Sequence, residues 1–173
     1  GLYDDDHYST AYDLSVITKY AIDLPYFKEI TSTYQYDVEG MDEPLETTNY
    51  TIDPSYSQYY YEHIEGGKTG YTDEAGKCLI TTANNGDYRY LCILLGSPFS
   101  YAENVNYAML DSKDLYEWAF QNISYKEILP NTESLKSVEV QYVWGDVTVD
   151  AMPSEQVVAL LPNDYEQSLV TTK

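Results

Sequence analysis

Residues 65–72 read Glu-Gly-Gly-Lys-Thr-Gly-Tyr-Thr, and two apolar segments follow them at residues 77–83 and 88–95. The apolar segments have the composition of strands, and Asn85-Gly86 between them is a strong signal for a two-residue hairpin turn. Glycines around Lys68-Thr69 remove side chains, so a ligand can lie against the backbone there. The lysine offers a positive charge and the threonine a hydroxyl. We therefore expect a carboxylate-binding segment in front of an antiparallel hairpin.

Both cysteines of the chain fall in this hairpin. A two-residue turn at Asn85-Gly86 sets a register with Cys78 opposite Ile93, so that the sulfurs of Cys78 and Cys92 point to opposite faces of the sheet and cannot bond. A three-residue loop would shift the register and bring them together. We expect two free, buried thiols.

A phosphate-binding loop is the main competing interpretation of Gly67-Lys68-Thr69. Such a loop needs a further glycine five positions before Gly67, and that position is Glu62. The apolar strand that should precede the loop is also absent from the sequence. The motif is therefore not a nucleotide site.

The charge of the chain restricts its partners. The formal net charge is −20 over 173 residues, and Arg89 is the only arginine. Nucleic acid would be repelled, and an anionic membrane surface is disfavoured. The acidic run Asp4-Asp5-Asp6-His7 reads as a solvated turn; a metal site is the alternative, although adjacent side chains rarely converge on one ion. We expect no metal and no cofactor.

The elements around the hairpin predict an α+β fold. Residues 9–22, 23–31 and 102–123 have helical spacing, and Thr10 with Asp13 fits a capping box at the first of these helices. The apolar residues of the first helix recur on one face, which we expect to be buried: Leu14, Ile17, Ala21 and Leu24. The segment at residues 91–95 is apolar on both faces, which is typical of a strand in the middle of a sheet with helices packed over it.

The character of the sequence changes after Pro130. Residues 138–143, 147–152 and 157–161 are short alternating strands, and no helical signal accompanies them. We therefore expect residues 1–130 to belong to one domain and residues 131–173 to begin a small all-β domain.

Four segments in order carry a resemblance to a known family: His-Tyr-Ser-Thr-Ala-Tyr-Asp-Leu at residues 7–14, Gly-Lys-Thr-Gly-Tyr-Thr at 67–72, Ala-Gly-Lys-Cys-Leu at 75–79, and the apolar strand that ends at Leu95-Gly96. Together they resemble the low-molecular-mass penicillin-binding proteins, and more narrowly the serine D-alanyl-D-alanine carboxypeptidases. The resemblance extends to about Tyr125. It implies part of a penicillin-binding-protein/β-lactamase-like domain, and the last residues are similar to that family's C-terminal domain.

The resemblance implies hydrolysis of the terminal D-Ala-D-Ala bond of peptidoglycan stem peptides through an acyl-serine intermediate. Lys68 would supply positive potential and join the proton network, and Thr69 would hydrogen-bond the substrate carboxylate. Gly70 would let the peptide approach the strand edge, where Thr72 lies further along. The backbone N–H of Tyr71 would contribute to the oxyanion hole.

The sequence departs from the family at its reactive residues. No serine has a lysine three residues on, and no Ser-x-Asn precedes Lys68. We expect the chain to be a piece of a longer protein and to be inactive alone. The family also has two strands beside the one matching residues 88–95, and both would precede Gly1. We expect an open edge there, which another copy or the chain's own tail would cover.

The resemblance also implies peptidoglycan stem peptides and β-lactam antibiotics as partners, and a place outside the cytoplasm in a bacterial cell envelope. Two alternatives remain open. One is a related acyl-transfer enzyme such as a β-lactamase or an esterase. The other is a non-catalytic module of an acidic surface protein that binds peptide or glycan through Lys68 and tyrosines.

Overall fold

The structure is a computed structural model that describes residues 2–142, 144–145 and 147–166. The chain divides into two compact units, Gly1–Trp118 and Ala119–Lys173. Helices and antiparallel sheets are mixed, so the fold is α+β as expected. A domain boundary near residue 130 stays a prediction.

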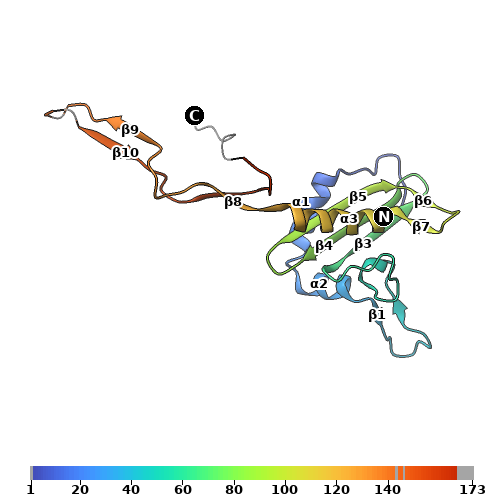
Figure 1. The fold of residues 1–173 in the computed structure, drawn as a ribbon. Helices are drawn as coiled ribbons and strands as arrows, with labels where there is room; N and C mark the ends of the chain where they lie inside the picture. Colours follow the sequence, from blue (N-terminus) through green and yellow to red (C-terminus); the bar gives the residue numbers. More distant parts are fainter. Residues whose placement is uncertain (1, 143, 146, 167–173) are drawn as a thin grey trace. The chain divides into compact units, whose positions relative to one another are not determined.

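A three-stranded antiparallel sheet is the centre of the first unit (Figure 1). Its strands are β3 (Ile64–Thr72), β4 (Gly76–Asn84) and β5 (Arg89–Ser97), in the order β3-β4-β5. The apolar segments thus form the expected hairpin, and residues 65–72 form the strand beside it. Among the described residues, β5 pairs only with β4. The expectation of a middle position for β5 is therefore wrong for this chain, while the expected open edge is present.

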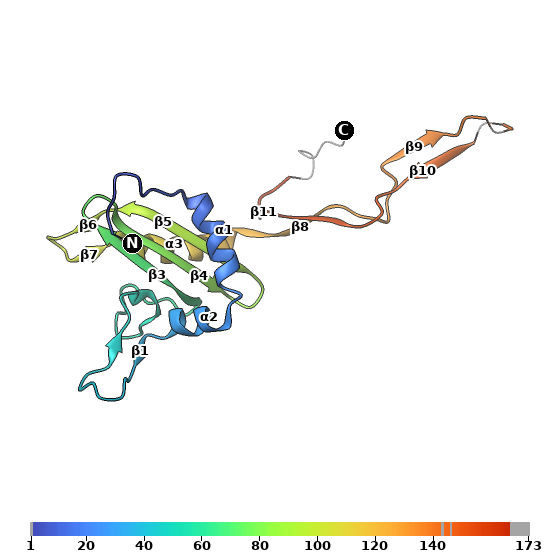
Figure 2. The same cartoon turned by 180° about the vertical axis from the view of Figure 1, so that it is seen from behind.

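Helices lie over both faces of this sheet, as Figures 1 and 2 show from opposite sides. Helix α1 (Ala11–Ala21) packs against β5, and helix α3 (Tyr107–Asn122) packs on the other face. A buried apolar cluster joins the sheet, α3 and the tyrosine-rich segment before β3; its members are Tyr59, Leu79, Ala108 and Met109. Tyr59 therefore belongs to the core.

The start of α1 is as predicted, but its buried face is not. Thr10 is the N-cap, and its Oγ1 accepts a hydrogen bond from the Asp13 N–H at 3.1 Å. The spacing predicted Ile17 on the buried face, yet 61% of Ile17 is exposed and Thr18 is buried instead. The Thr18 hydroxyl donates to the Leu14 carbonyl at 2.7 Å. Because this bond satisfies the hydroxyl, burying a threonine there costs little.

The loop between β4 and β5 differs from the predicted two-residue turn. The register pairs Asn84 with Arg89, so four residues form the loop. The Asn85 side chain accepts hydrogen bonds from the N–H groups of Asp87 and Tyr88, at 3.1 and 2.9 Å. These side-chain bonds favour a wider loop over the tight turn. As a result Cys92 faces Thr81 rather than Leu79. Both cysteines are free, as expected, but half-buried rather than buried.

Helix α2 (Pro25–Ser32) packs against β3 and begins with a proline in its first turn. Beside it lie a small antiparallel pair, β1 (Gln35–Tyr36) with β2 (Leu45–Glu46), and the short 3-10 helix η1 (Tyr50–Ile52). These elements follow α2 along the chain and are seen below the sheet in Figure 1. They place residues 47–49 next to β3.

The predicted helix at residues 102–123 begins later than expected. A small hairpin, β6 (Phe99–Ser100) with β7 (Val105–Asn106), precedes it. Asn104 in the hairpin has a φ of +55°, a conformation that a helix cannot continue through. The Asn106 side chain then accepts a hydrogen bond from the Ala108 N–H at 3.2 Å.

The second unit consists of two antiparallel pairs. Strand β8 (Ile123–Leu129) pairs with β11 (Val157–Pro162), and β9 (Lys136–Glu139) pairs with β10 (Thr148–Ala151). No strand was predicted at residues 124–129: the predicted helix ends at residue 123, where β8 begins, and no glycine or proline separates α3 from β8. The predicted strand at 138–143 is shorter than expected, and Val143 lies outside the described residues.

Two negative findings apply to the described residues. No helix there is long and apolar enough to cross a membrane. No group of three metal-binding side chains comes together there. At Asp4–His7, the His7 N–H donates to the Asp4 carbonyl at 2.9 Å in a turn.

Candidate functional site

The first part of β3 is fixed by close backbone packing. A bulge lies between Ile64 and Gly66. A Cβ atom added to Gly66 would lie 2.8 Å from the Thr31 carbonyl oxygen of α2, and one added to Gly67 would lie 2.1 Å from the Ile80 carbonyl oxygen of β4. Only glycine fits at these distances. The two glycines therefore allow β3 to pack closely against α2 and β4.

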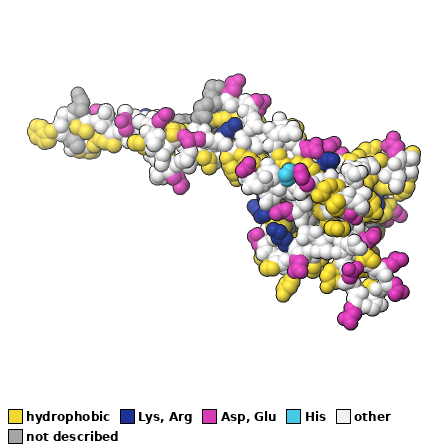
Figure 3. Space-filling view, turned by 60° about the horizontal axis from the view of Figure 1, so that its bottom comes forward, with side chains coloured by type: hydrophobic (Ala, Val, Ile, Leu, Met, Phe, Trp, Pro, Cys, Tyr) yellow, Lys and Arg dark blue, Asp and Glu magenta, His cyan; other side chains and the backbone are white. Residues whose placement is uncertain are grey.

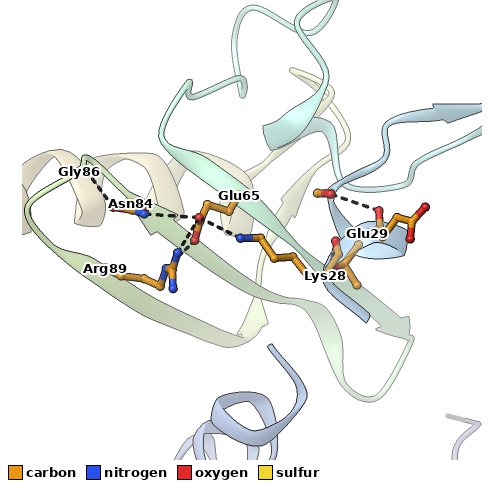
Figure 4. A network of polar contacts seen from close by, with 8 residues as sticks. Lys28, Glu29, Glu65, Asn84, Gly86 and Arg89 are labelled. Carbon is orange, nitrogen blue, oxygen red and sulfur yellow. Dashed lines mark hydrogen bonds and ion pairs between the residues drawn. The ribbon is translucent and has the colours of Figure 1, made fainter. Parts of the chain in front are cut away.

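Glu65, in the bulge, is the centre of a polar network (Figure 4). Arg89 holds its carboxylate through two atoms, with Nε–Oε2 at 2.7 Å and Nη2–Oε1 at 3.0 Å. Lys28 Nζ of α2 lies 3.7 Å from Glu65 Oε1, and the Asn84 side-chain amide donates to the same oxygen at 3.5 Å. Burial alone would raise the pKa of Glu65, but Arg89, with Asn84 and Lys28, outweighs burial and lowers that pKa. The network connects α2, β3, β4 and β5.

Lys68 and Thr69 follow immediately on the same strand. Lys68 is exposed and its Nζ donates to the Thr69 carbonyl. The Thr69 hydroxyl lies 2.6 Å from the hydroxyl of Thr48, which is the residue two before η1. The outer edge of β3 pairs with no strand among the described residues, so its backbone groups are available for a peptide. One ammonium and two hydroxyls thus meet at an open strand edge.

A cavity of about 570 Å³ adjoins these groups. Its lining comes from α2, the β1–β2 pair, residues 47–49 and the glycine-lysine-threonine part of β3. Asn49 is 2% exposed, and its Oδ1 accepts from the Thr51 hydroxyl at 2.6 Å. Its Nδ2 has no hydrogen-bond partner among the described residues. A buried amide donor without an acceptor is rare, because it costs free energy.

The remaining predicted residues lie further along β3. Gly70 is exposed, and a Cβ there would meet only the Cys78 Cβ at 3.5 Å. The Tyr71 hydroxyl donates to Asp73 at 2.6 Å, and Lys77 Nζ lies 3.9 Å from the Tyr71 ring. The hydrogen bond to Asp73 raises the pKa of Tyr71. The Thr72 hydroxyl accepts from the Ala75 N–H at 3.1 Å and so belongs to the β3–β4 turn.

A buried hydrogen-bond network supports the sheet behind this edge. The Tyr116 hydroxyl of α3 donates to the Thr81 carbonyl at 2.6 Å and accepts from the Cys92 N–H at 3.0 Å. Ser112 lies 2.9 Å from the Thr81 hydroxyl. Burial raises the pKa of Tyr116, and it raises the pKa of the Cys92 thiol to about 11. Both groups are therefore neutral at pH 7.

The structure places Lys68 and Thr69 together at the cavity, with Gly70, Tyr71 and Thr72 leading away from it. Sequence reasoning missed Thr48 and Asn49. The three polar residues Thr47-Thr48-Asn49 were a visible signal, but nothing in the spacing tied them to a strand twenty residues later. It also missed the network of Glu65, although Arg89 is the only arginine of the chain.

Comparisons with known proteins relate this chain to one family of enzymes. A family model described as D-alanyl-D-alanine carboxypeptidase, peptidase S11, matches residues 1–98. The D-alanyl-D-alanine carboxypeptidase DacF of Bacillus subtilis is 29% identical over 145 residues, covering 82% of this chain and 34% of that protein. The chain spans about a third or less of the length of the curated relatives it matches.

Solved structures of penicillin-binding proteins are also similar to this chain. Penicillin-binding protein D2 from Listeria monocytogenes, in a cefotaxime-bound form, is 32% identical, covers 69% of this chain and 45% of its own, and has a TM-score of 0.55. PBP3 from Streptococcus pneumoniae, a peptidoglycan synthesis regulatory factor, covers 91% of this chain and 42% of its own with a TM-score of 0.65; at 20% identity it shows the fold alone. Because the family model matches residues 1–98, more than half of the 173, the chain belongs to the D-alanyl-D-alanine carboxypeptidase family, peptidase S11.

Proposed function

We propose that the protein hydrolyses the terminal D-Ala-D-Ala bond of peptidoglycan stem peptides and that this chain supplies the strand that binds the substrate. The observation that carries the proposal is the open edge of β3, where Lys68 and the paired hydroxyls of Thr48 and Thr69 meet. A peptide that adds to this edge gains backbone hydrogen bonds, and its C-terminal carboxylate gains an ammonium and hydroxyl donors.

Each residue along the edge has a proposed role. Lys68 supplies positive potential and takes part in proton transfer, and Thr69 hydrogen-bonds the carboxylate. Gly70 leaves room for the peptide, since no side chain stands there. The Tyr71 N–H stabilises the oxyanion, and Thr72 lies at the end of the edge, where its hydroxyl also closes the turn.

The nucleophile is not among these residues, because no serine of the chain has a lysine three positions on. We propose that it lies on a part of the protein outside the 173 residues. Such a protein would also bind β-lactam antibiotics and would act outside the cytoplasm, in a bacterial cell envelope.

The test uses two samples, the protein expressed from the complete open reading frame and the 173-residue chain. The complete protein should release D-alanine from an acyl-D-Ala-D-Ala peptide, and Lys68→Ala should lower that rate by about 100-fold, since it removes a charge that acts in the transition state. The 173-residue chain should not be labelled by a fluorescent penicillin. A labelled band that survives denaturing electrophoresis, or an unchanged rate in Lys68→Ala, would contradict the proposal.

The open edge of β5 supports a further proposal about association. Among the described residues its outer backbone groups pair with no strand, and the strand is largely apolar. Exposed edges of this kind pair with other strands, so we propose that the chain self-associates through β5. A monomer in light scattering at high concentration, together with fast amide exchange along β5, would count against this.

A further inference from the structure

A second cavity lies at the far end of the binding strand. Its volume of about 340 Å³ falls within the range of small-molecule sites, about 300–1,000 Å³. Thr72, Glu74 and Ala75, at the end of β3 and in the turn after it, line one side of this cavity. Residues 2–5 and His7, in the loop before α1, line the other side, and Figure 2 shows this loop close to the end of β3. The cavity is therefore distinct from the one beside the first half of the strand.

The proposed binding mode sets the direction of the peptide along β3. The C-terminal carboxylate would lie at Lys68 and Thr69, and the carbonyl of the cleaved bond would lie at the Tyr71 N–H. The peptide therefore runs antiparallel to β3, and its preceding residues continue past Tyr71. Because both strands advance about 3.3 Å per residue, the residue before D-Ala-D-Ala would lie beside Thr72 and the turn that follows. The second cavity is at this place.

Hydrogen bonds within each segment hold the two walls of the cavity. The Thr72 hydroxyl accepts from the Ala75 N–H at 3.1 Å, which closes the turn after β3. In the loop before α1, the Asp4 side chain accepts from the Asp6 N–H at 2.9 Å, and the Asp4 carbonyl accepts from the His7 N–H at 2.9 Å. Both walls are thus built by local turns, as is usual where aspartate and threonine side chains bond to nearby backbone groups.

Three carboxylates line the cavity: Asp4, Asp5 and Glu74. All three residues are exposed, and none of them forms an ion pair with another described residue. The described lining contains no lysine and no arginine. Within the part of the chain that the structure describes, no three metal-binding side chains come together. The lining therefore suits a cation on a flexible chain, which needs only one carboxylate at a time.

The same cavity offers apolar surface to the stem of such a chain. Leu2 and Tyr3 line it and are 86% and 57% exposed. The Tyr3 hydroxyl donates to the Asp5 carboxylate, so the ring lies next to one of the charges. Methylene groups that cover these side chains leave water, while an ammonium at their end reaches a carboxylate.

The charge of the surrounding surface favours the same kind of ligand. The formal net charge is −20, and acidic side chains are spread over the face drawn in Figure 3, where lysine and arginine are few. A field of this sign attracts a cationic group and repels an acidic one, most strongly at low salt. Variants at the cavity are needed to separate its effect from that of the whole surface.

We propose that this cavity binds the side chain of the residue that precedes D-Ala-D-Ala and favours a side chain that ends in an amine. The inference rests on the proposed function, since the binding mode along Lys68–Tyr71 sets the direction of the peptide. It leaves the D-Ala-D-Ala end of the substrate unchanged and adds a preference at the residue before it. Asp4, Asp5 and Glu74 supply the charge for that preference.

The test uses the protein expressed from the complete open reading frame and measures D-alanine release at low salt. The substrates are three acyl-X-D-Ala-D-Ala peptides in which X is L-lysine, L-norleucine or L-glutamate. We expect kcat/KM for the lysine peptide to exceed that for the norleucine peptide by about 3- to 5-fold, as for an exposed ion pair. The glutamate peptide should have the lowest kcat/KM. Equal values for lysine and norleucine, or a higher value for glutamate, would overturn the proposal.

Variants then assign the preference to the cavity. Combining Asp4→Asn, Asp5→Asn and Glu74→Gln should bring the lysine-to-norleucine ratio of kcat/KM to about 1, since it removes all three charges. The ratio is taken within one variant, so a general loss of activity cancels. Glu74→Gln alone, which leaves the loop before α1 intact, should lower the ratio in part.

Asp6→Asn is the matched control, because Asp6 is an exposed carboxylate of the same loop that does not line the cavity. Its lysine-to-norleucine ratio should equal that of the natural protein. A lysine preference that survives the triple change, or that Asp6→Asn lowers equally, would overturn the assignment to the cavity.

The outcomes also separate this inference from the proposed function. If all three peptides release D-alanine with equal kcat/KM, only the inference fails. If none of the three releases D-alanine, the proposed function fails, and the inference fails with it because the direction of the peptide is lost.

Discussion

The two halves of β3 are held in opposite ways although they belong to one strand of nine residues. The anchored half, residues 64–67, is confined by α2, β4 and the Glu65 network. The exposed half, residues 68–72, pairs with β4 and leaves its other edge and the Lys68 side chain to solvent. The comparison indicates that one half fixes the position of the strand and that the other half carries the proposed binding groups. Substitutions in the two halves should therefore have different effects.

The largest effect is expected from Gly67→Ala in the anchored half. Its Cβ would lie 2.1 Å from the Ile80 carbonyl oxygen, and that backbone atom cannot rotate away. We expect the free energy of unfolding to fall by about 3 kcal/mol, as overpacking against fixed atoms does. Gly70→Ala is the control, because its Cβ would meet only the Cys78 Cβ at 3.5 Å. It should change the free energy of unfolding by less than about 0.5 kcal/mol. Urea unfolding followed by circular dichroism measures both, and equal losses would break the comparison.

Tyr116→Phe should have the next largest effect, because it removes the support behind the anchored half. Thr81, which faces Gly67 in the ladder, would lose its bonds to the Tyr116 hydroxyl. The partly buried N–H of Cys92 would lose its acceptor. We expect a loss of about 2 kcal/mol in the same unfolding experiment. Tyr8→Phe, at a side chain that is 85% exposed, should leave stability unchanged, and a comparable loss there would contradict this account.

Glu65→Gln tests the polar part of the anchor and its pH dependence. The folded-state pKa of Glu65 lies below its ordinary value of about 4.3. Its contribution is therefore complete above the unfolded-state pKa and disappears as the pH falls through the lower folded-state pKa. At pH 7 we expect a loss of about 1 kcal/mol.

The pH profile sharpens this test. The stability difference between the natural chain and Glu65→Gln should be constant from pH 8 to 5 and should shrink below about pH 4. Glu74→Gln, in the exposed turn after β3, should show little difference at any pH. A Glu65→Gln difference that grows as the pH falls would have the wrong sign.

The smallest effect on stability is expected in the exposed half. Lys68→Ala removes an exposed side chain whose ammonium donates to the next carbonyl in the strand, so the free energy of unfolding should change by less than about 0.5 kcal/mol. A thermal unfolding scan checks this. A loss near that of Gly67→Ala would show that the two halves are not distinct.

The sequence predicted which helices and strands form better than it predicted the loops that connect them and the strands that lie beside them. The hairpin, α1 and α2 follow from local patterns, caps and turn residues. The lysine-threonine-glycine segment was expected to be a strand only because of the family resemblance. The loop at Asn85 could not be foreseen, because Asn-Gly suits both a tight turn and the side-chain-bonded loop that forms. The position of β5 depends on which strands stand beside it, and local hydrophobicity does not encode that.

The candidate site was predicted in part for the same reason. Lys68 and Thr69 are adjacent in sequence and fall in one motif, so the sequence alone singled them out as candidates. Thr48 and Asn49 meet them only because α2 and the β1–β2 pair fold back beside β3. Such long-range contacts leave no periodic signal in the sequence.

The central claim, that the exposed half of β3 binds a peptide by its C-terminal carboxylate, has one direct test. The ¹⁵N-labelled 173-residue chain is titrated with acyl-D-Ala-D-Ala, with its C-terminal amide, and with the L-Ala-L-Ala form. We predict saturable shifts at Thr48 and residues 68–72 with the D,D-acid, weaker ones with the amide and the L,L-form, and none of the D,D-acid shifts in Lys68→Ala. Equal shifts with all three peptides, or shifts confined to other parts of the chain, would contradict the account.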